Sequence, residues 1–117
     1  MADTVNNDAR TAESLIRDLQ RMRDVPCAGC GQPVSPHEVL MAIAIGFQNS
    51  SRCLPCLGAA LEEEPAGLRD YLFGYIRQRE CFLSAWNWAN HAAGLADGVM
   101  PPNLQTLRPA SDAERKN

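Results

Sequence analysis

Four of the five cysteines form two identical pairs, and this arrangement is the strongest chemical signal in the sequence. Cys27 and Cys30 make one C-x2-C pair, Cys53 and Cys56 make the second, and 22 residues separate the two pairs. A C-x2-C turn curls the backbone so that two sulfur atoms approach one point, and two such turns supply the four thiolates of a tetrahedral zinc site. The spacing therefore predicts one structural zinc ion per chain, bound by all four cysteines.

The same ligands leave other chemistry open. Iron in a rubredoxin-like site, an iron–sulfur cluster, and four buried cysteines without a metal are weaker alternatives. Each of the two histidines, His37 and His91, is a candidate to replace one cysteine, which would give a set of three cysteines and one histidine. Cys53 and Cys56, at the start of a helix, also have the form of a redox dithiol, because the helix dipole stabilises a thiolate there. The lack of a surrounding βαβ pattern argues against a thioredoxin-like fold.

The segments between the cysteines carry the signals of a tight knuckle and of a helix. Gly29 and Gly31 permit the positive φ values that a knuckle demands. Ser35 and Glu38 have the spacing of a capping box, with Pro36 at the first helical position, and predict a helix that ends near Gly46. A strand is the competing prediction for residues 39–47, because the periodicity of a short apolar run does not distinguish a buried strand from a buried helix.

One knuckle followed by a cysteine pair at a helix start resembles the treble-clef and zinc-ribbon families of small zinc modules. The resemblance is one of spacing, and it covers residues 26–62. It implies a zinc site with four cysteine ligands. The treble-clef family usually places a β-hairpin between knuckle and helix, whereas the capping box predicts a helical insert in this chain.

The fifth cysteine, Cys81, is predicted to lie outside the metal site, on a long helix that spans residues 66–93. At 100° per residue it falls away from the apolar stripe of that helix, on the side that carries Arg77 and Trp88. Arg77 lies one turn before Cys81 and Trp88 two turns after it, which sets a thiol beside a cation and an indole. We interpret this face as a partner-binding surface or a reactive-thiol site. The alternative is that a second element covers it.

Helices are predicted for all the elements that position these residues. Besides the helix that starts at Ser35, apolar spacing indicates helices over residues 8–23, 53–64 and 66–93. The predicted core stripe of the long helix consists of nine residues: Leu68, Leu72, Tyr75, Ile76, Phe82, Leu83, Trp86, Ala89 and Ala93. Arg79 also falls inside this stripe, and its charge conflicts with a buried position.

The fold class predicted from these elements is mainly α, with about four helices in one small zinc-stapled domain over residues 8–98. Residues 1–7 are polar and predicted to be disordered, and residues 99–117 are predicted to be a flexible tail that contains prolines. The composition suits a single domain with a core, since 45% of the 117 residues are hydrophobic and 21% are charged. We expect no membrane segment and a cytoplasmic location.

The predicted function follows from the metal site and the long helix. We expect a small intracellular structural-zinc protein that acts as an accessory or regulatory subunit, with a larger protein or a second copy as its partner. No catalytic constellation is evident, so we do not expect an enzyme. A redox or sulfur-handling protein that uses Cys53, Cys56 or Cys81 is the alternative. The net charge of −3 disfavours a nucleic-acid-binding zinc module, although four arginines on or near the first helix allow one: Arg10, Arg17, Arg21 and Arg23.

Overall fold

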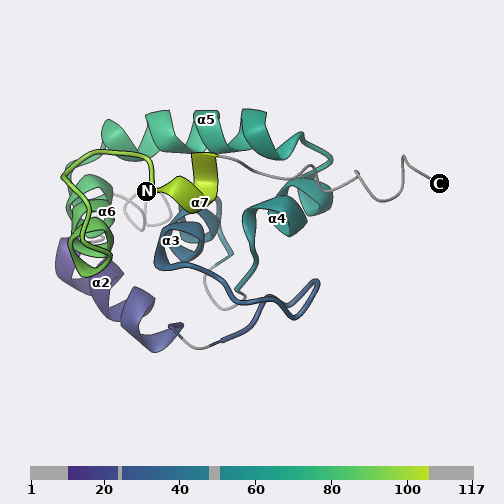
Figure 1. Cartoon of the computed structure of the whole chain (residues 1–117), viewed down its shortest axis with the longest axis horizontal. Coiled ribbons are helices and arrows are strands. Elements are labelled where there is room, and N and C mark those ends of the chain that lie inside the picture. The colour runs from purple at the N-terminus through teal and green to yellow at the C-terminus, as the bar shows by residue number, and fades with distance from the viewer. Residues whose placement is uncertain (1–10, 24, 48–50, 106–117) are drawn as a thin grey trace, which may run out of the picture.

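The computed structural model describes residues 11–23, 25–47 and 51–105, and these residues form a small helical domain (Figure 1). Its helices, in chain order, are α2 (Ala12–Arg21), α3 (Pro36–Ala44), α4 (Leu54–Leu61), α5 (Pro65–Arg77), α6 (Glu80–Ala92) and α7 (Pro102–Gln105). No strand is present in the described ranges. The mainly α prediction is therefore confirmed, and the helix is the correct choice for the start of the segment 39–47. The tail predicted for residues 1–7 lies outside the described residues, as does Arg10.

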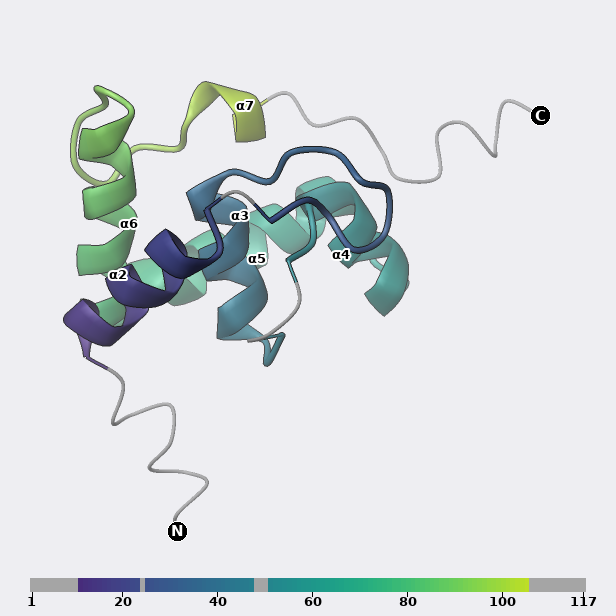
Figure 2. The same cartoon turned by 90° about the horizontal axis from the view of Figure 1, so that it is seen from below.

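Helix α3 is the centre of the domain, and the other long helices pack around it (Figure 2). The capping box that defines its start is present: the Ser35 hydroxyl accepts from the Glu38 amide, and the Glu38 carboxylate accepts from the Ser35 amide at 2.9 Å. Gly46, with φ of 101°, follows its end. Every residue from 37 to 43 is buried. This explains why the segment has almost no polar positions beyond its first turn.

The single long helix predicted over residues 66–93 is wrong, because the chain breaks it at Gln78 and Arg79. Arg79 has an extended backbone (φ −118°, ψ 119°) and precedes α6, and α6 runs in a different direction from α5 (Figures 1 and 2). A straight helix of that length would measure about 42 Å, too long to bury both halves of its stripe in one small core. The break lets α6 pack against α2 and α3, and it places the Arg79 guanidinium over the Tyr75 ring at 4.8 Å.

The apolar stripe predicted for this region survives the break in most of its members. Tyr75 and Leu83 are only half-buried, Ala93 is exposed, and Ala85 joins the core although the helical wheel did not select it. Trp86 is fully buried. The six stripe positions that are buried are Leu68, Leu72, Ile76, Phe82, Trp86 and Ala89.

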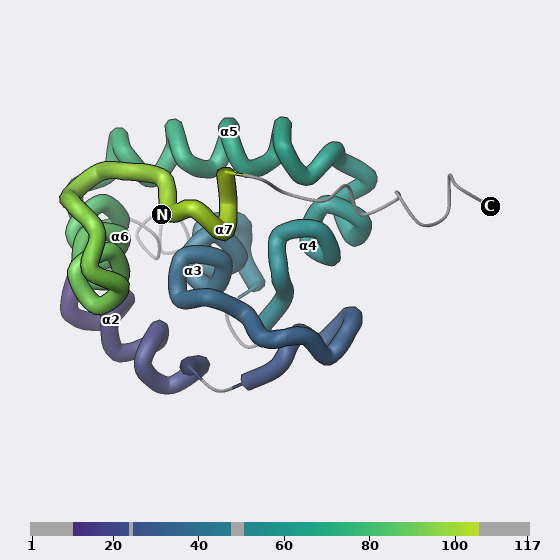
Figure 3. The backbone as a smooth tube through the Cα atoms, in the orientation of Figure 1, coloured from purple at the N-terminus to yellow at the C-terminus, as the bar shows by residue number. Residues whose placement is uncertain are grey.

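The segment after α6 differs from the predicted tail, because residues 99–105 pack against the domain. After α6 the chain doubles back and reaches α7, between α3 and α5 in the view of Figure 3. Leu104 is fully buried, and the Arg69 guanidinium donates to its carbonyl at 3.1 Å. Residues 106–117 of the predicted tail lie outside the described residues. In the described part of the chain, no helix has the length and apolar character needed to cross a bilayer.

Candidate metal centre

The two cysteine pairs converge in the structure as their spacing predicts. Cys27, Cys30, Cys53 and Cys56 each offer one sulfur atom, and these four atoms all lie within 4.8 Å of one another. The Cys30 and Cys53 sulfur atoms, which come from different pairs, are 3.7 Å apart. In a tetrahedron with zinc–sulfur bonds of about 2.3 Å, sulfur atoms are separated by about 3.8 Å. The cluster therefore has the size and the donor type of a tetrahedral metal site.

The first pair lies on a tight knuckle closed by backbone hydrogen bonds. The Gly31 amide donates to the Cys27 carbonyl at 2.8 Å, and Gly31 has the predicted positive φ, 79°. Gly29 has no positive φ, so the prediction for it was wrong. The reason for a glycine here is the close approach of Cys56. A Cβ atom at Gly29 would lie 3.1 Å from the Cys56 sulfur atom. A larger residue at this position would push the knuckle or Cys56 away by a few tenths of an ångström.

The second pair begins helix α4. Cys53 is its N-cap, with Pro55 in the first turn. The Ala28 amide donates to the Ser51 carbonyl at 2.7 Å, which fixes the knuckle beside the segment that leads into α4. Two amides, those of Gly29 and Cys53, donate to the Cys27 sulfur atom at 3.3 Å each. Amide donors of this kind stabilise negative charge on a thiolate ligand.

Three of the cysteines, Cys27, Cys53 and Cys56, have shifted pKa values. Burial disfavours the Cys27 thiolate, but the amides of Cys53, Gly29 and Cys30 outweigh it and lower the pKa of Cys27 to about 6. Burial raises the pKa of Cys56 to about 11 and raises the pKa of Cys53 further. One sulfur atom of the cluster thus favours the thiolate at neutral pH, while two of its neighbours favour the thiol. A divalent cation among them would supply the positive charge that stabilises four thiolates.

Glu38 links the metal centre to α3, which sequence reasoning missed. One carboxylate oxygen accepts from the Ser35 amide and hydroxyl, as the capping box predicts. The other accepts from the Leu54 amide at 2.8 Å, directly after Cys53. The side chain is 7% exposed. One buried carboxylate therefore caps two helices and holds the start of α4 against the start of α3.

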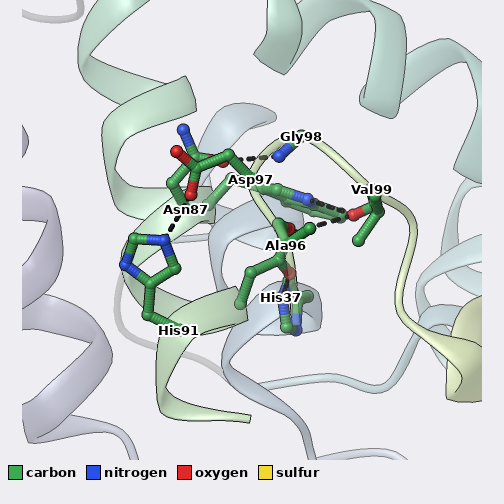
Figure 4. Close-up of polar contacts among 9 residues, drawn as sticks. His37, Asn87, His91, Ala96, Asp97, Gly98 and Val99 are labelled. Atoms are coloured by element: carbon green, nitrogen blue, oxygen red, sulfur yellow. Dashed lines mark hydrogen bonds and ion pairs between the residues drawn. The ribbon is translucent and has the colours of Figure 1, made fainter. Parts of the chain in front are cut away.

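The two histidines lie outside the cysteine cluster. His37 is in the first turn of α3 and His91 in the last turn of α6, as predicted. His37 is 3% exposed and its Nε2 atom is 2.6 Å from the Asn90 Oδ1 atom, while His91 pairs with Asp97 on the surface (Figure 4). In the described ranges, the residues grouped closely enough to hold a metal are the four cysteines alone. The alternative of three cysteines and one histidine is therefore not supported.

His37 belongs to a buried polar network that secures the chain after α6 (Figure 4). The Asn90 side-chain amide donates to the carbonyls of Ala96 and Val99, at 2.8 and 3.1 Å. Its oxygen must then accept from His37, so His37 carries its proton on Nε2. The Trp86 indole donates to the Val99 carbonyl at 2.9 Å. Burial lowers the pKa of His37, which keeps the ring neutral.

The second predicted site, formed by Cys81, Arg77 and Trp88, has a different geometry from the one expected. Arg77 ends α5 and Cys81 lies in the first turn of α6, so the expected one-turn separation along a single helix is wrong. The Arg77 guanidinium lies 5.3 Å from the centre of the Phe73 ring. Cys81 and Trp88 are half-buried against the core. That these residues bind a partner stays a prediction.

Comparisons with protein-family models, with curated proteins and with solved structures found no match to this chain. The account of its function therefore depends on the site itself.

Proposed function

We propose that the four cysteines bind one structural zinc ion and that the protein acts as a small accessory or regulatory interaction subunit. The observation that carries the proposal is the mutual distance of the four sulfur atoms, all within 4.8 Å, with Cys30 and Cys53 at a tetrahedral separation. Four protein ligands fill a tetrahedron, so such a zinc ion has no open position for a substrate. This geometry favours a structural role over a catalytic one.

The zinc ion would join elements that share little hydrophobic core. The knuckle around Cys27 is an irregular loop, and its outer residues from 28 to 33 are exposed. Its fixed contacts are the Ala28 hydrogen bond to Ser51 and the sulfur cluster. Zinc bound to both pairs would therefore fix the loop and the start of α4 in one geometry, and its binding energy would become folding energy.

A protein partner is supported by aromatic groups at the surface of α5 and α6. Tyr71 is 68% exposed, and exposed tyrosines of this kind are typical anchors of protein interfaces. Trp88 is half-buried and Arg77 is exposed. We propose a larger protein or a second copy as the partner. We also propose a cytoplasmic location, where the five cysteines stay reduced and the four of the cluster are available to zinc.

The redox alternative through Cys53 and Cys56 has less support. A redox dithiol at a helix start needs a thiolate with a lowered pKa. Burial raises the pKa values of both Cys53 and Cys56 instead. The metal-ligand role needs no such free thiolate, because zinc displaces the protons.

Elemental analysis combined with thiol counting tests the zinc site. We expect one zinc ion per chain in the protein purified without added metal, and one readily titratable thiol, that of Cys81. After denaturation with a chelator, all five thiols should react. Four or five reactive thiols in the untreated protein would contradict the proposal, and bound iron in place of zinc would be seen as visible absorption.

A further inference from the structure

We propose that Cys30 is the oxidation site of the metal centre, where hydrogen peroxide converts Cys30 and Cys53 into a disulfide and expels the zinc ion. The inference rests on the proposed zinc site and adds a modification to it. It starts from the unequal surroundings of the four sulfur atoms.

Cys30 is the accessible member of the cluster. It is exposed, whereas Cys53 and Cys56 are half-buried and Cys27 is 3% exposed. It lies on the knuckle, which runs beside α4 in both views of the fold (Figures 1 and 2). A peroxide molecule can therefore reach the Cys30 sulfur atom from solvent, while protein covers much of the other three.

The pattern of hydrogen bonds to the sulfur atoms also favours Cys30 as the thiolate that attacks peroxide. Two amides, those of Gly29 and Cys53, donate to the Cys27 sulfur atom. Within the described residues, no amide donates to the Cys30 sulfur atom. Hydrogen bonds to a thiolate withdraw electron density and lower its nucleophilicity. As a zinc ligand, Cys30 would be a thiolate at neutral pH, without the amide donors that engage the electron pairs of the Cys27 sulfur atom.

Cys53 is positioned to resolve the oxidised group. Its sulfur atom is 3.7 Å from that of Cys30 and lies on the other side of the site, at the start of α4. In the first step the Cys30 thiolate attacks peroxide: the O–O bond breaks, an S–O bond forms, and hydroxide leaves and takes a proton. In the second step the Cys53 thiolate attacks the Cys30 sulfur atom, the S–S bond forms, and the S–O bond breaks to release a second hydroxide, which takes a proton.

The balance is one peroxide reduced to two water molecules, two thiolates oxidised to one disulfide, and two protons taken from solvent. Zinc keeps only Cys27 and Cys56 as ligands and leaves. The new disulfide connects the same two elements that the metal connected, the knuckle and the start of α4. The oxidised protein should therefore keep its fold without zinc, unlike the reduced zinc-free protein.

The test is a titration of the full-length, zinc-loaded protein with hydrogen peroxide, with released zinc followed by a chromogenic chelator and disulfides mapped by peptide mass spectrometry. We expect one zinc ion released per peroxide consumed and a Cys30–Cys53 disulfide as the main product. A thiol reductant with added zinc should restore the metal. Cys81→Ala, which removes the thiol outside the cluster, should release zinc at the same rate.

Melting curves give a second readout without changing a ligand. The oxidised zinc-free protein should melt at least about 5 °C above the reduced protein treated with chelator, because the disulfide restricts the unfolded chain. Zinc retained after several equivalents of peroxide, zinc released without a disulfide, a disulfide within one C-x2-C pair, or one that includes Cys81 would overturn the inference. A protein that binds no zinc at the outset would instead overturn the proposed function, and this inference with it.

Discussion

The domain fixes its two irregular segments by different means. In the knuckle at residues 27–32 only Cys27 is buried, and its two cysteines join the four-sulfur cluster. The segment after α6 is fixed instead by the buried network of Asn90, Trp86 and His37. The first turn of α3 contacts both surroundings: Glu38 accepts from the Leu54 amide, next to Cys53 of the cysteine cluster, and His37 is bonded to Asn90 of the polar network. In the proposed function a metal would substitute for a core on one side of this turn, while buried hydrogen bonds complete a core on the other.

This comparison predicts that loss of one cysteine ligand lowers the stability of the domain more than loss of any single core side chain. Cys56→Ala removes one thiolate, and structural zinc contributes about 10 kcal/mol or more of binding energy, comparable to the whole stability of a small domain. We expect loss of zinc and a melting temperature lower by about 20 °C or more. Elemental analysis and calorimetry measure both effects. Cys81→Ala is the matched control, because Cys81 lies outside the cluster, and an equal loss for the two variants would contradict this assignment.

On the other side of the turn, Trp86→Ala should cost about 3 to 5 kcal/mol of stability, because it empties a fully buried site and removes the donor to Val99. Zinc binding at one ion per chain should persist. Trp88→Ala, at a half-buried position, should cost about 1 kcal/mol or less and weaken any complex with a partner. Urea unfolding compares the two. If Trp88→Ala is as damaging as Trp86→Ala, the partner surface assigned to Trp88 is part of the core.

Glu38→Gln tests the carboxylate that joins the two regions. An amide side chain offers one acceptor oxygen and places an NH2 group where an oxygen now accepts from Ser35 or Leu54. We expect a loss of about 1 to 3 kcal/mol in stability together with weaker zinc binding, since the start of α4 loses its support. Competition with a zinc chelator measures the affinity. Glu63→Gln, at an exposed position, should change neither quantity; unchanged affinity in Glu38→Gln would show that the link does not support the metal centre.

The smallest effect concerns pH. Burial lowers the pKa of His37 in the folded protein below the ordinary value of 6.5. The unfolded chain therefore binds a proton first as the pH falls, so the contribution of His37 to stability is complete above about pH 6.5 and declines below it. His37→Gln keeps a donor for Asn90 and does not titrate, so its free energy of unfolding should fall less between pH 7 and pH 5.5. Parallel curves for the two proteins would contradict the neutral, buried assignment.

The clustering of the four cysteines could be predicted from sequence because its signal is local. Two C-x2-C pairs require no knowledge of the fold, and the capping box at Ser35 and Glu38 sets the start of α3 in the same way. The second oxygen of Glu38 could not be predicted, since its acceptor role toward Leu54 depends on how α3 and α4 pack. Gly29 was selected for the wrong reason, because the crowding by Cys56 is a contact between distant segments.

The C-terminal half shows where local signals fail. Neither glycine nor proline marks the break at residues 78 and 79, and the apolar period continues through it. Tertiary packing against α2 and α3 decides the break, and the misplaced charge of Arg79 was the one indication. The packing of residues 99–105 depends on backbone carbonyls that accept from Trp86, Asn90 and Arg69. Any residue offers a backbone carbonyl, so the sequence does not reveal these acceptors, and its prolines and scattered charges indicated a tail instead.

X-ray absorption at the zinc edge tests the central claim most directly, because it counts the ligands around the metal and measures their distances. For the protein purified without added metal, the account predicts four sulfur atoms at about 2.3 Å and no nitrogen or oxygen in the first coordination shell. A shell with a histidine nitrogen or with water, or fewer than four sulfur atoms, would contradict a structural zinc site built from Cys27, Cys30, Cys53 and Cys56.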